Sequence, residues 1–175
     1  VGSGTRQGAM SSFLPDVLTR IGEALGLSAQ ARRQALAGSL LLSADNGHAV
    51  HPNFPEKADP ANRVYPNGGV VIKYSANQKY TTTGLTAGLF QAICQKAGVP
   101  VQVFSNRADE PGGSTLGNLL GHQVSIPMVD IGMAQLAMHS AVETAGSRDP
   151  EYMARACAAF FQAEFTQTAD GVYQF

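Results

Sequence analysis

The sequence is poor in charged residues and has no long apolar run. Lysine, arginine, aspartate and glutamate make up 14% of the 175 residues, whereas about 25% is usual for a soluble domain. The 12 basic and 13 acidic residues give a net charge of −1, so the charge balance argues against a basic module that binds nucleic acid or an anionic membrane. No apolar stretch approaches the roughly 18 residues that span a membrane. We therefore predict no nucleic-acid partner and no membrane partner.

Cysteine is also rare, which bears on the compartment. Cys94 and Cys157 both stand in apolar segments, and such cysteines are typical of reduced core residues rather than of a disulfide. The N-terminus lacks the basic region and the apolar stretch of a signal peptide. Together these features predict a cytoplasmic protein.

The chain opens without a methionine, and its first residues read as the middle of a loop. We therefore expect that Val1 is not the first residue of the gene product; a cloning remnant at Gly2 and Ser3 is the alternative. The apolar content is 44%. Combined with the low charge, it predicts that a partner subunit or another part of the same protein covers much of the surface.

Helical and strand patterns alternate along the chain. The predicted helices cover 12–25, 28–37, 83–97, 114–122 and a segment from 149 onward. The predicted strands cover 39–43, 70–74, 101–104 and 124–131, the last of them broken by Pro127. Residues 44–69 have no periodicity and predict a long loop, and the tail after Phe165 predicts a loose end. The alternation favours an α/β fold with a mixed, largely parallel sheet sandwiched between helices, in a single domain over 1–175.

Three of the predicted helices carry apolar residues on one side at helical spacing, and we expect those of the last helix to point inward. They are Leu14, Val17, Leu18, Ile21 and Leu25 in the first helix, Leu85, Leu89, Ala92 and Ile93 in the helix over 83–97, and Met153, Ala156, Cys157, Phe160 and Phe161 in the last. The 19 glycines and 9 prolines favour tight turns and irregular loops over a helical bundle.

The densest polar cluster follows the predicted strand over 39–43. Asp45, His48 and His51 place one carboxylate and two imidazoles within seven residues, and zinc binds both kinds of ligand. Ligands bind at the carboxyl ends of strands in open α/β sheets, so the cluster predicts a divalent-metal site. The alternative is structural: Asp45 caps a turn, and one histidine satisfies buried backbone groups.

Two further segments carry candidate functional residues. His139 follows the strand-like residues 128–131 and is either a ligand or a satisfied core histidine, whereas His122 ends a helix and is expected at the surface. The glycines at 112–113 precede a helix and favour either an anion-binding turn or a close backbone approach. No Walker lysine and no dinucleotide fingerprint is present, so nucleotide binding is not expected.

Three sequence blocks, in this order, resemble the aspartyl aminopeptidase family of di-zinc exopeptidases. The blocks are 43–53, then 71–73 with 77–80, then 113–117 with 129–132 and 135–140. The resemblance extends from Val1 to about Phe161, and Val-Gly-Ser at the start matches the tail of the family's Glu-Glu-Val-Gly-Ser motif. It implies an incomplete zinc-aminopeptidase-like catalytic domain, with this chain as the C-terminal part.

The resemblance implies a role for each matching position. Asp45 corresponds to the carboxylate ligand of one zinc, and His139 corresponds to the imidazole ligand of the other. His48, Lys73 and Tyr80 correspond to substrate-contacting positions. Structural or supporting positions of the family correspond to His51, Asn53, Asp109, Gly113 and Ser114.

The family's general-base glutamate, bridging aspartate and first metal-binding histidine have no counterpart in the 175 residues. The resemblance therefore implies a zinc-dependent aminopeptidase with two zinc ions per complete site, for which cobalt or manganese can substitute, and an isolated chain without activity. Its substrates are peptides, with acidic N-terminal residues as one candidate class, although Ala108 departs from the family's usual Asn or Ser. The implied partners are the missing N-terminal part of the same protein and further copies in a homo-oligomer, such as a tetrahedral dodecamer.

Two other functions stay open at this point. The same fold can serve as a non-catalytic structural subunit of a large oligomer. A metal-binding or transport protein built on His48 and His51 is less well supported, because it needs more ligands. The enzyme hypothesis makes a spatial prediction: Asp45 and His139 project into one crevice, lined by His48, Lys73 and Tyr80.

Overall fold

Four strands form the central sheet in the computed structural model, which describes residues 3–169 and 172–174. Their order is β1 (Leu41–Ala44), β5 (Met128–Gly132), β3 (Val70–Tyr74) and β4 (Val101–Ser105). The pairs β1–β5 and β3–β4 are parallel, and β3 runs antiparallel to β5 in the middle. The prediction of an α/β fold with a mixed, largely parallel sheet is therefore confirmed.

Alternation along the strands gives the sheet two different faces. Val70 and Ile72 join a buried apolar cluster with side chains of the long helices. Val71 and Lys73 lie between them in sequence and point to the opposite face, where Val71 belongs to a second apolar cluster. Asp130 interrupts the apolar strand β5 in the same way. The second face thus carries the polar side chains that build the site.

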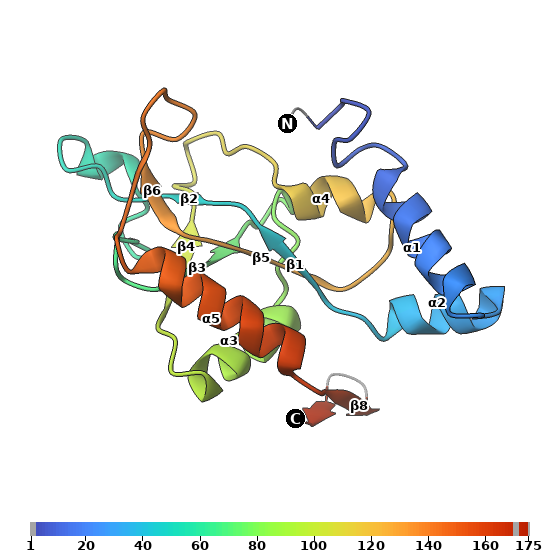
Figure 1. The fold of residues 1–175 in the computed structure, drawn as a ribbon. Helices are drawn as coiled ribbons and strands as arrows, with labels where there is room; N and C mark the ends of the chain where they lie inside the picture. The colour runs from blue at the N-terminus through green and yellow to red at the C-terminus, as the bar shows by residue number, and fades with distance from the viewer. Residues whose placement is uncertain (1–2, 170–171, 175) are drawn as a thin grey trace.

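Helices cover both faces (Figure 1). The helices α3 (Gly84–Lys96) and α5 (Asp149–Gln162) pack on each other and on the apolar face, whereas α4 (Leu116–Gly121) contacts β1 and β5 from the side of Ser43. A capping box of Thr83 and Thr86 fixes the start of α3.

A small second sheet lies beside the polar face. It consists of β2 (Gly47–His48), β6 (Ala134–Leu136) and β7 (Thr144–Ala145), with β2 parallel and β7 antiparallel to β6. The stretch 44–69, predicted as a loop throughout, therefore contains a strand as well as the short 3-10 helix η1 (Pro55–Lys57). Strand β2 has only two residues, which is too few for a periodic sequence pattern. It is recognised as a strand only through its pairing with β6.

The first two helices, α1 (Phe13–Ala24) and α2 (Ala29–Ala37), lie together at one end of the molecule (Figure 1). The apolar stripe predicted on the first helix is largely uncovered: Ile21 is 51% and Leu25 is 69% exposed. In α1 only Gly22 is buried. The helical spacing predicts an apolar face correctly, but the described residues do not provide the surface that would cover it.

Other expectations hold only in part. Phe161, expected to point inward, is 82% exposed, whereas Met153 and Phe160 of the same helix pack against the core cluster. Leu85, on the apolar side of its helix, is 39% exposed. The break predicted at Pro127 is confirmed, and only the part from Met128 onward forms a strand, β5. Pro127 cannot donate to a ladder, and its carbonyl accepts from the N–H of Leu41.

The end of the chain is also more ordered than its composition predicted. The tail expected to be loose forms the antiparallel strands β8 (Thr166–Ala169) and β9 (Val172–Gln174). Among the residues that the structure describes, no helix is long and apolar enough to cross a membrane.

Candidate active site

The five residues predicted to bind metal or substrate line one cavity of about 760 Å³. They are Asp45, His48, Lys73, Tyr80 and His139. They come from the end of β1, from β2, from β3, from the loop before α3 and from the loop between β6 and β7. The cavity lies on the polar side of the central sheet, so segments up to 94 positions apart in the sequence meet there.

Asp45 is positioned by its backbone. Directly after β1, its N–H donates to the carbonyl of Ile131 at 2.8 Å. The neighbouring Gly132 on β5 has no side chain, and a Cβ there would overlap the carbonyl oxygen of Asp45. The glycine thus lets the chain cross close to β5 and turn the Asp45 carboxylate, which is half-exposed, toward the cavity.

Lys73 is the most buried charged side chain of the cavity, at 2% exposure. Its Nζ lies 3.6 Å from Asp45 Oδ2, donates to the carbonyl of Asn46 at 3.3 Å, and sits 5.0 Å from the centre of the Tyr80 ring. Burial lowers the pKa of Lys73, while the carboxylates of Asp45 and Asp130 oppose this decrease. The ammonium is thus held at the base of the cavity by few partners and remains able to bind an anionic ligand group.

Tyr80 closes the cavity beside Lys73. Its hydroxyl oxygen accepts a hydrogen bond from Asn106 Nδ2 at 3.0 Å, and its ring packs 6.3 Å from that of Phe104. Burial raises the pKa of Tyr80, so the phenol stays protonated at neutral pH. With its oxygen already accepting, the hydroxyl is oriented to donate its proton to a ligand.

His48 and His139 form the imidazole side of the cavity. His48 extends from β2, whose register with β6 is His48 to Gln135. Partial burial, followed by repulsion from His139 and Lys73, lowers the pKa of His48, although Asp45 has the opposite effect. A neutral imidazole is the form that binds metals and donates a single hydrogen bond.

The loop that carries His139 has an unusual backbone. His139 has a φ of +66° and Ala137 a φ of +55°, in the left-handed region that non-glycine residues rarely adopt. The backbone N–H of His139 donates to Glu143 Oε1 at 2.6 Å, and Ser140 N–H donates to the Ala137 carbonyl at 3.0 Å. These bonds hold a strained loop conformation at the cavity, as is common in functional sites.

A buried carboxylate below the cavity was not predicted from the sequence. Asp130 is fully buried and accepts hydrogen bonds from Ser43 Oγ at 2.5 Å and from the N–H and hydroxyl of Thr81 at 2.5 and 2.8 Å. Ser43 Oγ in turn accepts from the N–H of Gly117 at 2.8 Å. The network ties β1, β5, the loop of Tyr80 and the start of α4 together. The sequence signal that could have revealed this buried carboxylate is the single aspartate within the otherwise apolar strand β5.

The supporting residues implied by the resemblance divide into two groups. Gly113 and Ser114 belong to the cavity lining. His51 lies outside it; its Nδ1 accepts from the N–H of Asn53 at 3.2 Å, and its ring packs against Phe54. Asp109 pairs with Arg107 at 2.6 Å on the surface. His122, expected at the surface, is exposed at the end of α4.

The cavity offers a partial zinc site. A carboxylate and an imidazole, from Asp45 and His139, line it together, and both are zinc ligands by chemistry. Among residues 3–169 and 172–174, however, no group of three or more histidine, cysteine, aspartate or glutamate side chains is arranged to hold a metal. Since zinc in proteins takes at least three protein ligands, these residues fit part of a zinc site and require further ligands.

Sequence comparison identifies related proteins along nearly the whole chain. The model of the family "Aminopeptidase I zinc metalloprotease (M18)" matches residues 1–161. A probable M18 family aminopeptidase 2 of Mycobacterium tuberculosis is 44% identical over 167 residues, which cover 95% of this chain and 39% of that protein. Its counterpart in Clostridium acetobutylicum is 45% identical over 161 residues, covering 92% and 37%. The chain thus spans about two fifths of the length of these curated relatives.

Solved structures share the fold. A cryo-EM structure of the Ape4 and Nbr1 complex matches with a TM-score of 0.88 and 42% identity, over 92% of this chain and 30% of that one. A structure of the mApe1 dodecamer of Saccharomyces cerevisiae matches with a TM-score of 0.79 and 30% identity, over 93% and 35%. The arrangement of sheet and helices described above is therefore that of a known group of structures.

Proposed function

Because the chain belongs to the M18 family of aminopeptidase I zinc metalloproteases, we propose that it forms part of the catalytic domain of a metalloaminopeptidase that removes N-terminal residues from peptides. The observation that carries the proposal is the shared cavity of Asp45, His139, His48, Lys73 and Tyr80. These side chains combine two zinc ligands with a buried cation and two hydrogen-bond donors.

Each group has a role in the proposed reaction. Asp45 and His139 would hold one zinc ion each, and zinc, when bound, supplies Lewis-acid polarisation of the scissile carbonyl and acidifies a water. Lys73 and the Tyr80 hydroxyl stabilise negative charge on the substrate, because their donors are fixed in a partly dry cavity. His48 donates its N–H to the same substrate. Cobalt and manganese are proposed as substitute metals.

Acidic N-terminal residues are the proposed substrate class. The buried Lys73 ammonium is the charge that would attract a side-chain carboxylate, and its nearest anion, Asp45, is 3.6 Å away and solvated on one side. The side-chain carboxylate of an acidic first residue would form a charge-assisted hydrogen bond with this buried cation. Substrate peptides of the form Asp-Xaa and Glu-Xaa are therefore the first to assay.

The isolated 175 residues are proposed to be inactive. Two donors do not retain zinc, and no glutamate lines the described cavity as a general base. The complete gene product, or this chain together with the preceding part of the same protein, is the proposed active unit. We propose a homo-oligomer for it, with a dodecamer as in the mApe1 relative, and a cytoplasmic location in keeping with two free cysteines.

The test is hydrolysis of aminoacyl-nitroanilides by the complete gene product with added zinc. Asp45→Ala and His139→Ala are each expected to abolish turnover and to lower the bound zinc measured by atomic absorption. Asp16→Ala and His122→Ala are matched controls, since both residues lie outside the cavity lining, and they are expected to keep both properties. The absence of turnover in the unaltered protein, or full activity in the two cavity variants, would refute the proposal.

A non-catalytic structural subunit is the second candidate. The exposed apolar face of α1 favours an assembly role, whether or not the protein is also an enzyme. The codons that precede Val1 separate the two: a Glu-Glu pair supports the peptidase, and a start codon supports the structural subunit.

A further inference from the structure

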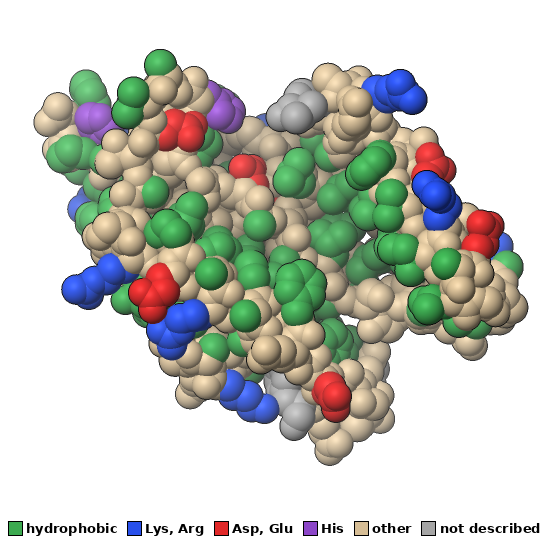
Figure 2. Space-filling view, viewed as in Figure 1, with side chains coloured by type: hydrophobic (Ala, Val, Ile, Leu, Met, Phe, Trp, Pro, Cys, Tyr) green, Lys and Arg blue, Asp and Glu red, His purple; other side chains and the backbone are tan. Residues whose placement is uncertain are grey.

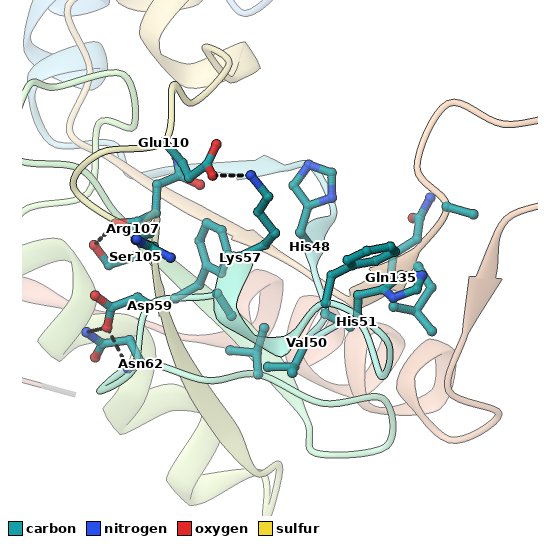
Figure 3. A pocket seen from close by; sticks show the side chains of 18 of the residues that line it. His48, Val50, His51, Lys57, Asp59, Asn62, Ser105, Arg107, Glu110 and Gln135 are labelled. Carbon is teal, nitrogen blue, oxygen red and sulfur yellow. Dashed lines mark hydrogen bonds and ion pairs between the residues drawn. The ribbon is translucent and has the colours of Figure 1, made fainter.

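Figure 3 shows a second pocket, of about 280 Å³. This pocket adjoins the cavity of Asp45 and His139. The two spaces share four lining residues: His48, Phe104, Asn106 and Pro111. The pocket therefore begins at the wall of the cavity and continues away from Asp45. Its volume is sufficient for one amino-acid side chain with its backbone, and a peptide bound in the cavity has this pocket as its next space along the surface.

The pocket is held open by contacts between its two walls. One wall is η1, and the other is the loop that follows β4. Lys57 Nζ on η1 lies 2.6 Å from Glu110 Oε1 on the loop, as Figure 3 shows, and Arg107 donates to the carbonyl of Glu56. Behind them, the N–H of Val50 donates to the carbonyl of Val64 at 3.0 Å. These non-covalent contacts hold the two walls in place without a ligand, which lowers the entropy cost of binding one.

Each charged group that lines the pocket already has polar partners. Lys57 pairs with Glu110, and Arg107 Nε lies 2.6 Å from Oδ1 of Asp109, a residue outside the lining. Asp59 Oδ1 accepts three hydrogen bonds from the two residues at 61–62. The two cations and two anions of the lining balance in formal charge, so the pocket favours neither a cationic nor an anionic ligand.

The remaining lining is apolar. Val64 is 1% and Phe104 is 7% exposed, and both belong to one buried cluster with the partly buried Leu136 at its edge. Phe54 stands at the rim with 55% of its surface exposed, stacked obliquely on His51 at 5.2 Å. An apolar side chain that enters would cover Phe54 and lie over this floor, whereas glycine would leave both in water.

We propose that this pocket is the subsite for the residue that directly follows the scissile bond, and that it selects an uncharged apolar or aromatic side chain there. The inference rests on the proposed aminopeptidase function, because that function places the first residue of the substrate at Asp45 and His139. A peptide that continues from there past His48 enters the pocket, because His48 lines both spaces.

The experiment compares two peptides with the same preferred first residue and either Leu or Gly at the second position, using the complete gene product. The unaltered protein is expected to have a kcat/KM about tenfold higher for the Leu peptide, the usual gain from filling an apolar subsite. Ala58→Trp fills the pocket from a position with extended backbone, and Phe54→Ala removes its exposed rim. Both are expected to reduce the Leu-to-Gly ratio to about twofold or less, through a lower kcat/KM for the Leu peptide.

Ala158→Trp is the matched control, since it adds the same ring on an exposed part of α5 and should preserve the ratio. An unchanged ratio in both pocket variants would overturn the subsite while leaving the peptidase intact. A changed preference for the first residue would also overturn it, by assigning the pocket to that residue. No hydrolysis of either peptide by the unaltered protein would overturn the proposed function, and the subsite with it.

Discussion

Lys73 shows how one residue can be costly for the fold and useful in a site. An ammonium at 2% exposure loses most of its hydration, and its contacts with Asp45 and Asn46, at 3.6 and 3.3 Å, are long. Such partners compensate burial poorly. A buried lysine with these contacts is better explained by a ligand that completes the hydrogen bonds of its ammonium than by a contribution to stability.

Lys73→Met therefore separates the two roles. In the complete gene product we expect kcat/KM for peptides with an acidic first residue to decrease by about 100-fold or more, as when one partner of a buried charge-assisted hydrogen bond is removed. The midpoint of thermal unfolding should change little, because an apolar side chain of similar length replaces a buried charge. Lys96→Met, at the end of α3, is the control for loss of one positive charge. A large loss of stability with unchanged activity would assign Lys73 to the fold.

The two cysteines differ in environment, which predicts a difference in reactivity with pH. Cys94 is fully buried and Cys157 is half-buried. Burial raises the pKa of Cys94 to about 12, so at pH 8 only about one thiol in ten thousand is the reactive thiolate. The unfolded chain loses this proton near its ordinary value, so this residue's contribution to stability is present below pH 9 and decreases as the pH rises toward 12.

A thiol-labelling experiment checks this difference. At pH 8 the folded protein should react with a disulfide reagent first at Cys157, and Cys94 should react only after denaturant is added. Cys157→Ser should remove the early phase and Cys94→Ser should keep it. Two early phases in the unaltered protein, or equal rates at both thiols, would contradict the burial of Cys94.

Gly132 links strand β5 to the position of Asp45. Because a Cβ at Gly132 would overlap the Asp45 carbonyl, Gly132→Ala is expected to push the segment after β1 away from the sheet. We expect a loss of about 3 kcal/mol in the free energy of unfolding, the upper part of the range for overpacking a core, together with lower zinc retention. Chemical denaturation and metal analysis measure the two effects.

Gly88 is the matched control for this substitution. It is exposed within α3, and a Cβ there meets nothing within 4 Å. Gly88→Ala should raise the free energy of unfolding by about 0.5–1 kcal/mol, because alanine is the better helix former. If both variants had the same effect, the close approach of β5 and Asp45 would not be the cause.

Local signals predicted the elements but not their surroundings. The run 70–74 is β3 as predicted, and the start of α3 follows from Thr83 and Thr86, whose capping is local. Phe161 fails because helical spacing defines an apolar face without showing whether this chain covers it. Asp130 was missed because its partners Ser43 and Thr81 are 87 and 49 positions away, and only the folded sheet brings them together.

At the level of the molecule, several large apolar side chains of α1 and of the residues next to it are left uncovered by the described residues. Met10, Phe13, Ile21 and Leu25 are each more than half exposed, and Figure 2 shows hydrophobic side chains along this end of the surface. A helix with such a face is stable only when the face is buried against another surface. The matched part is only 39% of the Mycobacterium tuberculosis protein, so that relative has a long further stretch of chain. A corresponding stretch could supply the surface that covers α1.

Hydroxyl-radical footprinting compares the two situations directly. In the isolated 175 residues, Met10 and Phe13 should be oxidised at rates that match their exposure of 55% and 59%. In the complete gene product, α1 should be protected by about tenfold, because burial excludes the radical along with water. Val142, 77% exposed in the loop after His139, gives the reference rate within each sample. Equal oxidation of α1 in both samples would mean that the apolar face stays open to solvent, and the low charge of the sequence would then need a cause other than a covering surface.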